Sequence, residues 1–550
     1  MEKKKIIISL VVIGIISLFL KLYFIDFSTY IVSDATSYAL NSFSYLNNDF
    51  TPIHNKSPGW PILISIFSQF IDSESFIDYG NMIKILSISI STITILPVYL
   101  LARKWFPEKY SLVAASFFAF EPHLNNNAGI GYTEPLYIIF WVIAFYFISS
   151  DKYKFVLIAF VIAALAWWVR WPGAILFVIL SVIYFVNFRK IKNGYLKYLG
   201  CLGIFIALIL PMLLQRYEEF GNPLYYGIGS QFFVGEYPLL QSDIINKSAE
   251  VYSLFDSIKN IGFLNFLNKF IVSGIINLFT ELAKISFPYL ILLIPFGILF
   301  SFRAFDQDKK LIRSNWILLI ISFCSLILTF SVVPEKRYLL TFIPFLILFS
   351  IIPIQRVVTY GLSTFSFSEK QKNVCLIMII CIALVSSIVF MQRYDTSNEL
   401  ELEEKTKFAD YMLNNFEGTI IDGGNTLQGL RYLKLVDPPG SFKMYQNSNH
   451  NNPQQTMLKE GYLVPFASTD KLISVSMYAK TLDEFMMIAK EYEIDYISIR
   501  EEGPEQVFYP YFDKIYTNES QYHFFEKVFD SDERGYKEFK VKVFKINLMD

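Results

Sequence analysis

The sequence predicts an α-helical polytopic membrane protein that carries a small α/β domain at its C-terminal end. Of the 550 residues, 53% are hydrophobic and 18% are charged, whereas soluble chains usually contain about 25% charged residues. Apolar runs close to the length that a helix needs to cross a bilayer recur as far as residue 391. After residue 393 the sequence becomes polar and mixed in charge. These observations divide the chain into a membrane module, 1–393, and a second domain, 394–550.

The apolar runs predict about eleven transmembrane helices. We expect them near residues 6–25, 82–101, 110–122, 133–149, 154–169, 172–188, 198–215, 284–302, 314–333, 338–354 and 373–391. Basic residues gather in alternate connecting segments, beginning with Lys3, Lys4 and Lys5, which predicts that these segments are cytoplasmic. The odd number of spans then puts the C-terminal domain outside the cell, together with loops at about 26–81 and 216–281. We expect an integral protein of the plasma (cytoplasmic) membrane.

Strand-like and helix-like segments follow one another after residue 394. The segments "GTIIDGG", "EIDYISIR" and "KEFKVKVFKI" are typical of strands, and "EEKTKFADYMLNN" and "TLDEFMMIAKEYE" are typical of helices. This alternation predicts the small extracytoplasmic α/β domain.

Charge and cysteine usage exclude two classes of function. A net charge of −1 offers none of the concentrated basic surface that nucleic-acid binding requires. The four cysteines all lie in apolar runs, and none falls in the C-terminal domain. We therefore predict neither a disulfide framework nor a metal cluster, and we interpret the cysteines as small packing residues.

Charged residues lie at the ends of the predicted spans, and the middle of each span is free of Asp, Glu, Lys and Arg. Ion-coupled transporters usually place ionisable residues near the bilayer midplane, where substrate and ion bind, so the pattern disfavours that class. The charges near the outer face are Asp34, Lys84, Glu121, Glu134, Arg170, Glu281, Lys284, Glu335, Lys336 and Arg337. We infer that any chemistry takes place at the outer membrane–water interface.

A site at this depth suits a sugar attached through phosphate to a long polyprenyl tail, because the tail stays in lipid while the headgroup meets water. Transfer of that sugar needs a carboxylate within hydrogen-bond reach of the attacking hydroxyl. It also needs cations for the charge that grows on the departing phosphate, and the planar fork of arginine suits this role.

Five local signatures resemble one family in order along the chain. They are "SDATSYALNSFSYL" after the first span, "HNKSPGWPILISIF" in the first outer loop, "GYTEPLYIIFW", "WWVRWPGAILF" and "PEKRYLLTFIPFL". Over about residues 6–349 the chain resembles the GT-C superfamily of membrane glycosyltransferases, in particular dolichyl-phosphate-mannose protein mannosyltransferases and bacterial aminoarabinose and lipopolysaccharide sugar transferases. The resemblance implies a helical GT-C-like module and a polyprenyl (dolichyl) phosphate-linked sugar donor instead of a nucleotide sugar.

The resemblance implies two catalytic carboxylates. Asp34 matches the acidic residue of the first outer loop, which acts as general base in the family. An Asp at this position also suits the N-cap of a helix that begins near Ala35, so both roles stay open. Glu134 matches the acidic residue that precedes a proline, and its alternative role is a first-turn Glu that interacts with the helix dipole.

The resemblance also implies substrate-binding residues. Arg337, with Tyr338, and Arg170 match the family's Arg-Tyr and Arg-Pro-Gly segments and would hold the donor phosphate. Interfacial arginines also reach lipid headgroups, and Arg170 lies in a Trp-rich stretch typical of an interfacial belt. Glu121 and His123 are candidates for orienting the acceptor. One His with one acid is a poor metal signature, so we predict no metal site and no cofactor, although a divalent metal stays compatible with the pattern.

The sequence departs from the oligosaccharyltransferases of the superfamily. No "WWDYG"-type motif follows residue 393, and no second acid adjoins Asp34, which disfavours transfer of a preassembled glycan to Asn. We expect an inverting glycosyltransferase whose acceptor is a protein, a lipid or a growing glycan. The alternatives are a lipid-linked glycan carrier or flippase without covalent chemistry, and a non-catalytic scaffold of an envelope-glycan assembly complex.

Overall fold

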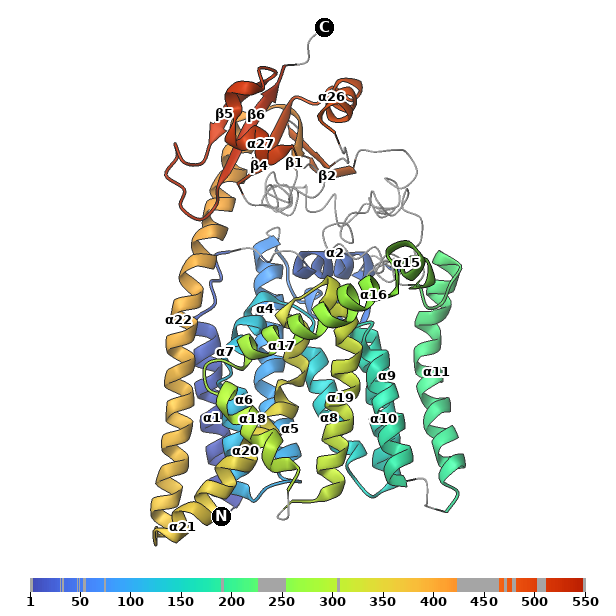
Figure 1. Ribbon diagram of the computed structural model, residues 1–550, viewed down its shortest axis with the longest axis vertical. Helices are drawn as coiled ribbons and strands as arrows, with labels where there is room; N and C mark the ends of the chain where they lie inside the picture. Colours follow the sequence, from blue (N-terminus) through green and yellow to red (C-terminus); the bar gives the residue numbers. More distant parts are fainter. Residues whose placement is uncertain are drawn as a thin grey trace.

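The computed structural model describes residues 3–547 apart from 30, 32–33, 47, 49, 53–55, 74–75, 189–191, 226–253, 304–306, 423–463, 469–471, 477–480 and 502–510. Helices form an elongated bundle, and a small domain that contains a β-sheet stands on one end of it (Figure 1). The N-terminus lies at the opposite end of the bundle (Figure 1). We call these two ends of the bundle the domain side and the far side.

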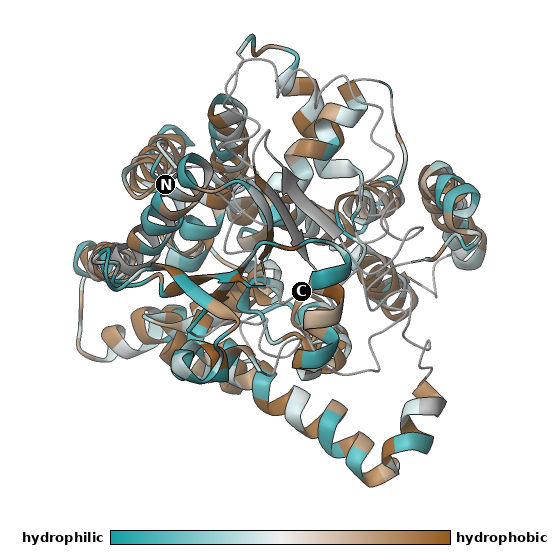
Figure 2. Ribbon diagram, turned by 90° about the horizontal axis from the view of Figure 1, so that it is seen from above, coloured by the Kyte–Doolittle hydropathy of each residue, from teal (hydrophilic) through white to brown (hydrophobic). Residues whose placement is uncertain are grey.

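Helices make up nearly all of the described membrane module, because a helix satisfies its own backbone hydrogen bonds in an apolar medium. They are α1 (Lys3–Tyr23), α2 (Asp34–Leu46), α3 (Gly59–Ser68), α4 (Phe76–Ile93), α5 (Ile95–Ala102), α6 (Glu108–Ala119), α7 (Pro122–Ile130), α8 (Glu134–Ile148), α9 (Tyr153–Val169), α10 (Gly173–Phe188), α11 (Gly194–Phe220), α15 (Leu254–Ile261), α16 (Phe263–Phe266), η2 (Leu267–Val272), α17 (Ser273–Ser286), α18 (Leu290–Ser301), α19 (Lys309–Val332), η3 (Lys336–Phe342), α20 (Ile343–Arg356), η4 (Val357–Gly361) and α21 (Leu362–Thr364). Seen from above in Figure 2, most of these helices are viewed end-on and carry many hydrophobic residues.

Seven helical stretches of the described chain are long and apolar enough to cross a membrane. They are Lys3–Tyr23, Ile77–Ala102, Gly194–Phe220, Phe263–Ser286, Lys309–Val332, Lys336–Thr364 and Glu369–Arg393. Shorter apolar helices are Gly59–Ser68, Glu134–Ile148, Tyr153–Val169, Gly173–Phe188 and Leu290–Ser301. The predicted helical, polytopic class is therefore confirmed, while the number of about eleven spans stays a prediction.

The segment that the sequence assigns to an outer loop, 216–281, is partly helical. α11 continues to Phe220, and α15, α16, η2 and α17 together cover most of 254–286. Figures 1 and 2 show this second stretch running obliquely along one side of the bundle. Polar and charged residues such as Lys269 and Glu281 dilute its apolar pattern, so the sequence predicts a loop here, although Phe263–Ser286 is long and apolar enough to cross a membrane. Residues 226–253 of the expected loop lie outside the described residues.

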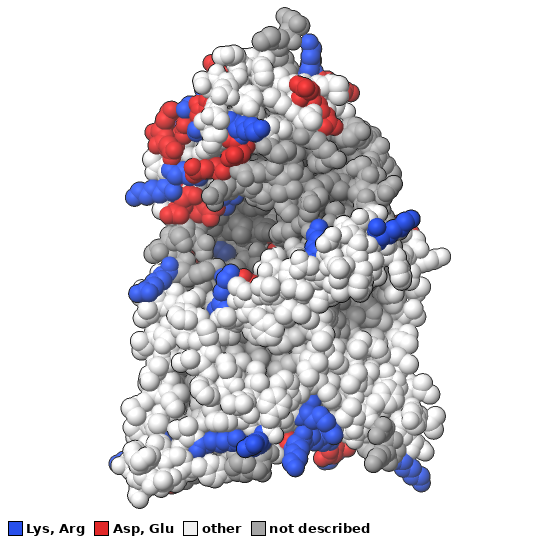
Figure 3. All heavy atoms as spheres, viewed as in Figure 1, with Lys and Arg blue, Asp and Glu red and all other residues white. Residues whose placement is uncertain are grey.

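Charged side chains avoid the middle of the membrane module on the face shown in Figure 3. A broad band there is free of Lys, Arg, Asp and Glu, and charges gather at its two rims and on the domain.

Charges buried near the domain side have polar partners. Lys21 Nζ donates to Ser17 Oγ at 2.6 Å, and Lys84 Nζ donates to the carbonyl oxygens of Asp26 and Thr29 at 2.8 and 2.6 Å. Such partners offset part of the cost of removing a charge from water.

One helix, α22 (Glu369–Asn415), connects the membrane module with the domain. Its 47 residues correspond to about 70 Å at the rise of an α-helix, and Figure 1 shows it running from the far side into the domain. At its C-terminal end, Phe408 and Met412 pack in a core cluster with Phe539 and Val543 of the domain. The compositional change near residue 393 therefore falls inside a continuous helix, and no flexible linker separates the two parts at this point.

The domain contains a six-stranded sheet in the order β2-β3-β1-β4-β6-β5. Its strands are β1 (Gly418–Asp422), β2 (Val464–Ser468), β3 (Leu472–Ser476), β4 (Tyr496–Arg500), β5 (Phe525–Asp530) and β6 (Val541–Ile546), and its helices are α26 (Leu482–Glu491), α27 (Phe512–Thr517) and η6 (Glu519–Gln521). β1 pairs in parallel with β3 and β4, and the outer pairs are antiparallel. The expected mixture of strands and helices is present, whereas its extracytoplasmic location stays a prediction.

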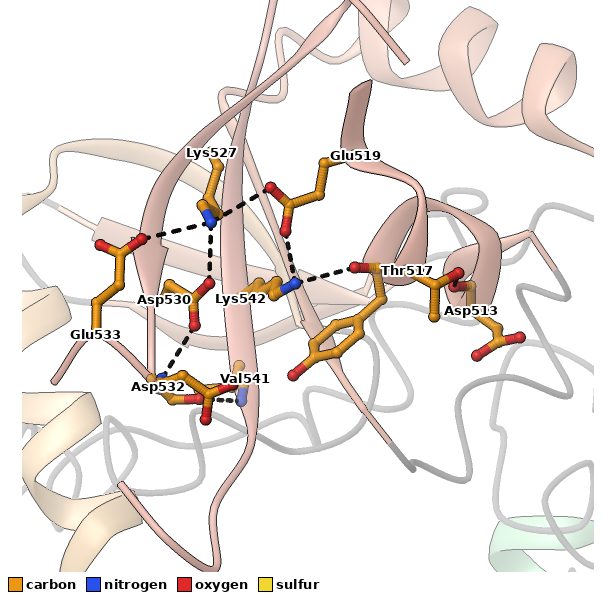
Figure 4. A network of polar contacts seen from close by, with 11 residues as sticks. Asp513, Thr517, Glu519, Lys527, Asp530, Asp532, Glu533, Val541 and Lys542 are labelled. Carbon is orange, nitrogen blue, oxygen red and sulfur yellow. Dashed lines mark hydrogen bonds and ion pairs between the residues drawn. The ribbon is translucent and has the colours of Figure 1, made fainter. Parts of the chain in front are cut away.

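Ion pairs join strands β5 and β6 to η6, and a hydrogen bond joins β6 to α27 (Figure 4). Lys527 of β5 contacts Asp530 at 3.0 Å, Glu519 at 3.3 Å and Glu533 at 3.4 Å. Lys542 of β6 contacts the same Glu519 at 2.5 Å and donates to the carbonyl oxygen of Tyr516 at 3.0 Å. The two lysines share one carboxylate, so the network fixes these short helices on the sheet.

Candidate functional site

Asp34 is the first residue of α2 and lies at the domain side of the membrane module. Its carboxylate contacts two cations from separate parts of the chain. Lys56 Nζ donates to Oδ1, and Arg337 Nη1 donates to Oδ2 at 2.6 Å. Lys56 lies in the loop that precedes α3, and Arg337 is 303 residues away in η3. The side chains of Asp34 and Arg337 are 23% and 22% exposed, so the pair is shielded and still accessible.

The two cations determine the charge of Asp34. Burial alone would raise the pKa of its carboxyl group, whereas Lys56 and Arg337 lower that pKa through charge and hydrogen bonding. The cations prevail, and the pKa of Asp34 is held well below its usual range. Asp34 is therefore ionised at neutral pH. Although it begins a helix, both of its carboxylate oxygens are engaged by side-chain cations, so a capping role alone does not describe it.

A second ion pair joins Glu134 to Arg170. Glu134 begins α8 with Pro135 directly after it, and Arg170 follows the last residue of α9. Arg170 Nη1 donates to Glu134 Oε1, and the Glu134 side chain is 1% exposed. The other oxygen, Glu134 Oε2, is buried without a hydrogen-bond partner among the described residues. Arg170 is thus turned inward to a carboxylate and does not extend to lipid headgroups.

Tyrosine rings lie between the two ion pairs. The Tyr338 ring centroid lies 5.6 Å from the Arg170 guanidinium and 5.4 Å from that of Arg337. Tyr38 is one helical turn after Asp34, and its ring centroid lies 5.2 Å from Lys56 Nζ. The Tyr38 hydroxyl is close enough to feel the charges of both ion pairs. The two pairs therefore form one continuous site.

Close backbone contacts fix the positions of the loops that carry these residues. A Cβ added to Gly59 would lie 2.7 Å from the carbonyl oxygen of Trp168, so the segment after Lys56 packs directly on the end of α9. A Cβ added to Gly173 would lie 2.5 Å from the backbone of Trp167, so the turn after Arg170 needs glycine. Trp60 is fully buried and donates from Nε1 to the carbonyl oxygen of Gly131 at 3.1 Å.

Glu121 and His123 belong to a different environment. Glu121 is the N-cap of α7, where its Oε2 accepts from the backbone N–H of Leu124 at 2.6 Å. His123 Nε2 lies 3.2 Å from the carbonyl oxygen of Lys284, and its ring packs edge-on against Phe390 of α22. No ion pair or hydrogen bond among the described residues connects either side chain with Asp34 or Glu134. Their observed contacts are those of helix capping and helix packing, and their predicted role with the acceptor stays a prediction.

Sequence reasoning missed Lys56. The residue stands in the "NKSPGW" part of the first outer loop, where one Lys among polar residues gives no signal of its own. Its closeness to Asp34 depends on how the loop between α2 and α3 folds back. Among the described residues there is no group of three or more His, Cys, Asp and Glu side chains that could hold a metal ion.

The arrangement combines an ionised carboxylate, two cations beside it and a buried second carboxylate with one unpaired oxygen. They lie together with α2, which is at the domain side of the bundle (Figure 1). Such a site can accept a proton from a hydroxyl and can bind an anion such as a phosphate.

Comparison with known proteins places this geometry in context. Residues 55–214 match the family model described as dolichyl-phosphate-mannose-protein mannosyltransferase. The oligosaccharyltransferase of Archaeoglobus fulgidus, tethered with an acceptor peptide containing the NVT sequon, shows a TM-score of 0.58 at 14% identity, covering 94% of this chain and 72% of that chain. Its complex with an inhibitory peptide and a dolichol-phosphate shows a TM-score of 0.52 at 14% identity, covering 90% and 69%.

A bacterial structure is similar along nearly its whole length. ArnT from Cupriavidus metallidurans, bound to undecaprenyl phosphate, shows a TM-score of 0.51 at 10% identity, covering 98% of this chain and 97% of that chain. No curated protein sequence matches the chain. At these identities the solved structures establish a common fold. The matched family model over residues 55–214 and these structures agree that the chain has the fold of GT-C membrane glycosyltransferases.

Proposed function

We propose that the protein transfers a sugar from a polyprenyl (dolichyl) phosphate-linked donor to an acceptor at the outer membrane–water interface. The observation that carries the proposal is the Asp34 carboxylate held between Lys56 and Arg337, beside the Glu134–Arg170 pair. The site lies where a lipid tail remains in the apolar band while its phosphate reaches the cations. Structures similar in fold hold a dolichol-phosphate or undecaprenyl phosphate.

Donor binding changes the charge balance at Asp34. The donor phosphate competes with the Asp34 carboxylate for Lys56 and Arg337, because both anions need the same cations. As those cations turn to the phosphate, the pKa of Asp34 rises from its depressed value toward the range of an effective base. Substrate binding thus raises the basicity of the Asp34 carboxylate, which in the free protein is ionised and paired with both cations.

The chemical step is a displacement at the anomeric carbon. Asp34 takes the proton of the acceptor hydroxyl, and the acceptor oxygen forms a bond to the anomeric carbon. The bond between that carbon and the phosphate oxygen breaks, and its electron pair leaves with the polyprenyl phosphate. Attack opposite to the phosphate inverts the configuration. Arg337 and Lys56 stabilise the developing phosphate charge, and Arg170 holds Glu134, whose unpaired Oε2 accepts a hydrogen bond from a substrate hydroxyl.

The reaction as proposed needs no cofactor, because side-chain cations supply the positive charge. Treatment with a metal chelator should therefore leave transfer unchanged. A chelator-sensitive activity that returns on adding a divalent cation would contradict this part of the proposal.

The decisive experiment asks whether membranes that contain the protein release free polyprenyl phosphate from a sugar-loaded donor. Wild type should release it, and the Asp34→Asn variant at matched expression should not. A carrier or flippase would move the intact donor across the bilayer without release, and a scaffold would do neither. Donor that stays intact with every acceptor class, namely protein, lipid and glycan, would overturn the proposal.

A further inference from the structure

Arg216, near the end of α11, is a buried cation outside the two ion pairs of the candidate site. Its side chain is 1% exposed and is among the largest fully buried side chains of the described chain. Its guanidinium lies 4.9 Å from the ring centroid of Trp171 and 5.6 Å from that of Phe220. Nε donates to the carbonyl oxygen of Tyr225 at 3.1 Å, and Nη1 donates to that of Lys56 at 3.4 Å.

These contacts reach both loops that carry the candidate site. The carbonyl that accepts from Arg216 belongs to Lys56, whose ammonium group contacts Asp34. The indole beneath Arg216 belongs to Trp171, which directly follows Arg170. The close approach of Gly59 to Trp168 shows independently that the same two loops touch. Arg216 therefore lies at their junction.

Lys56 and Arg216 also line one small pocket, together with Asn41, Tyr45 and Gln215, among others. A lysine side chain is long and flexible, so its ammonium group meets a partner reliably only when its backbone is fixed. Without the contact to the Lys56 carbonyl, the loop loses a restraint.

We propose that Arg216 is a positioning residue that clamps the Lys56 loop to the Trp171 turn and so keeps the Lys56 ammonium group at Asp34 and the donor phosphate. The fork of arginine suits this task, because it donates in two directions while its face stacks on an aromatic ring. The inference rests on the proposed glycosyl transfer.

The test uses the acidic limb of the pH profile of kcat/KM, which reports the pKa of the free protein's base. The ionisable groups around Asp34 are Lys56 from the loop before α3, Tyr38 from α2, Tyr132 and Glu134 from the α7–α8 region, Arg170 from the end of α9, and Glu335, Arg337 and Tyr338 from the η3 region. Wild type should stay active down to the lowest pH at which it is folded, because Lys56 and Arg337 hold the pKa of Asp34 low. In full-length Arg216→Met the limb should move upward into the pH range in which the protein is folded.

Four further variants separate positioning from folding and from charge. Lys56→Met should move the limb in the same direction, and Lys56→Met with Arg216→Met should move it no further than Lys56→Met alone. Arg216→Lys keeps the charge but loses the fork, so its limb should also be displaced. Arg356 is the matched control, because it donates to the carbonyl oxygen of Arg303 at 2.8 Å and lies 5.2 Å from the Phe300 ring at the far side. Arg356→Met should leave the limb unchanged, whatever it does to stability.

An unmoved limb in Arg216→Met, with activity falling only in proportion to folded protein, would overturn the proposal. So would additive shifts in the double variant, or a limb fully restored in Arg216→Lys. These outcomes require an active wild type. A wild type that releases no polyprenyl phosphate would instead refute the proposed function itself, so the two failures are distinguishable.

Discussion

As the proposed base, Asp34 would have to meet two requirements that oppose each other in the free protein. A base needs a pKa high enough to accept a proton, whereas Lys56 and Arg337 hold the pKa of Asp34 well below its usual range. The opposition disappears if the same cations bind the donor phosphate, since the carboxylate then loses its partners as the substrate arrives. At the scale of single residues, Asp34 is therefore best tested with variants that change its basicity while preserving its shape.

Asp34→Asn should abolish transfer while leaving the fold intact. Asn can begin a helix almost as well as Asp, but it cannot take the proton of the acceptor, and loss of a general base commonly lowers the rate by about a hundred- to ten-thousand-fold. The measurement is sugar transfer at matched protein levels, with thermal stability recorded in parallel. Transfer at close to the wild-type rate would reduce Asp34 to a structural residue.

Arg337→Lys should weaken both donor binding and turnover. The substitution keeps the charge but loses the planar fork that contacts Asp34 and Glu335, so we expect a loss of about 1–3 kcal/mol in transition-state stabilisation. Initial rates over a range of donor concentrations measure this loss. Kinetics identical to those of wild type would show that the fork has no part in phosphate recognition.

At the scale of elements, α22 connects the two halves of the molecule by a specific carboxylate. Glu404 is 5% exposed, and it accepts hydrogen bonds from the backbone N–H groups of Lys537, Glu538 and Phe539 at 2.8, 2.9 and 2.8 Å. Burial alone would raise the pKa of Glu404, but these three donors prevail and lower it below its ordinary value of 4.5. The helix is thus held to the strand region by a charge that must remain ionised.

Glu404→Gln should destabilise the full-length protein by about 1–3 kcal/mol, because an amide accepts these hydrogen bonds less well and faces one N–H with its own. The sign of the pH dependence follows from the lowered pKa. The stabilisation that Glu404 gives the folded state is complete above the pKa of this residue in the unfolded state. It is lost as the pH falls through the pKa of Glu404 in the folded state. Thermal unfolding at pH 7 and at pH 4 measures it, and the difference between variant and wild type should shrink at pH 4.

The matched control lies next to it on the same helix. Glu403 is 57% exposed and pairs with Lys407 one helical turn later, so Glu403→Gln should change stability by a few tenths of a kcal/mol at most. Equal destabilisation by the two variants would show that general charge on α22, and not the Glu404 contacts, matters.

At the scale of the whole molecule, the charge-free band separates two chemically different ends. The N-terminus lies at the far side and the domain at the other end of the bundle (Figure 1), and the charges of the membrane module gather at its rims (Figure 3). We predict that the basic loops lie in the cytoplasm, so that the candidate site and the domain both face outward. The domain would then lie on the same side of the membrane as the site.

Cysteine labelling in intact cells tests this orientation. In a variant whose four native cysteines are replaced, Ser520→Cys in the domain should react with an impermeant thiol reagent, and Lys309→Cys at the start of α19 should not. Both positions are exposed, so access depends on the side of the membrane. Labelling at Lys309 before permeabilisation would reverse the orientation, and labelling at both positions only after permeabilisation would place the domain inside.

The sequence by itself determined the membrane class, and it predicted the domain arrangement and several members of the candidate site. The hydropathy of a segment and the basic residues of a loop depend on that segment's own composition. They can therefore be interpreted without knowing which other segments pack against it. Asp34, Glu134, Arg170, Arg337 and Tyr338 were predicted from local signatures, and the structure brings them together, although their roles await the experiments above. The oblique stretch Phe263–Ser286 was not predicted as a span, because its polar residues dilute the apolar signal.

Only the tertiary structure decided which charges meet. Asp34 and Arg337 are 303 residues apart, and no spacing along the chain indicates that Arg337 pairs with Asp34 while Arg170 pairs with Glu134. Lys56 lies in a signature segment that does not single it out, and Arg216 lies in none. Their places follow from backbone contacts such as that of Gly59 on the end of α9. Glu121 and His123 have residue types suited to a site, yet the packing of α7 turns them to other partners. Ion pairing depends on distances of a few ångströms, and helix packing, not sequence pattern, sets those distances.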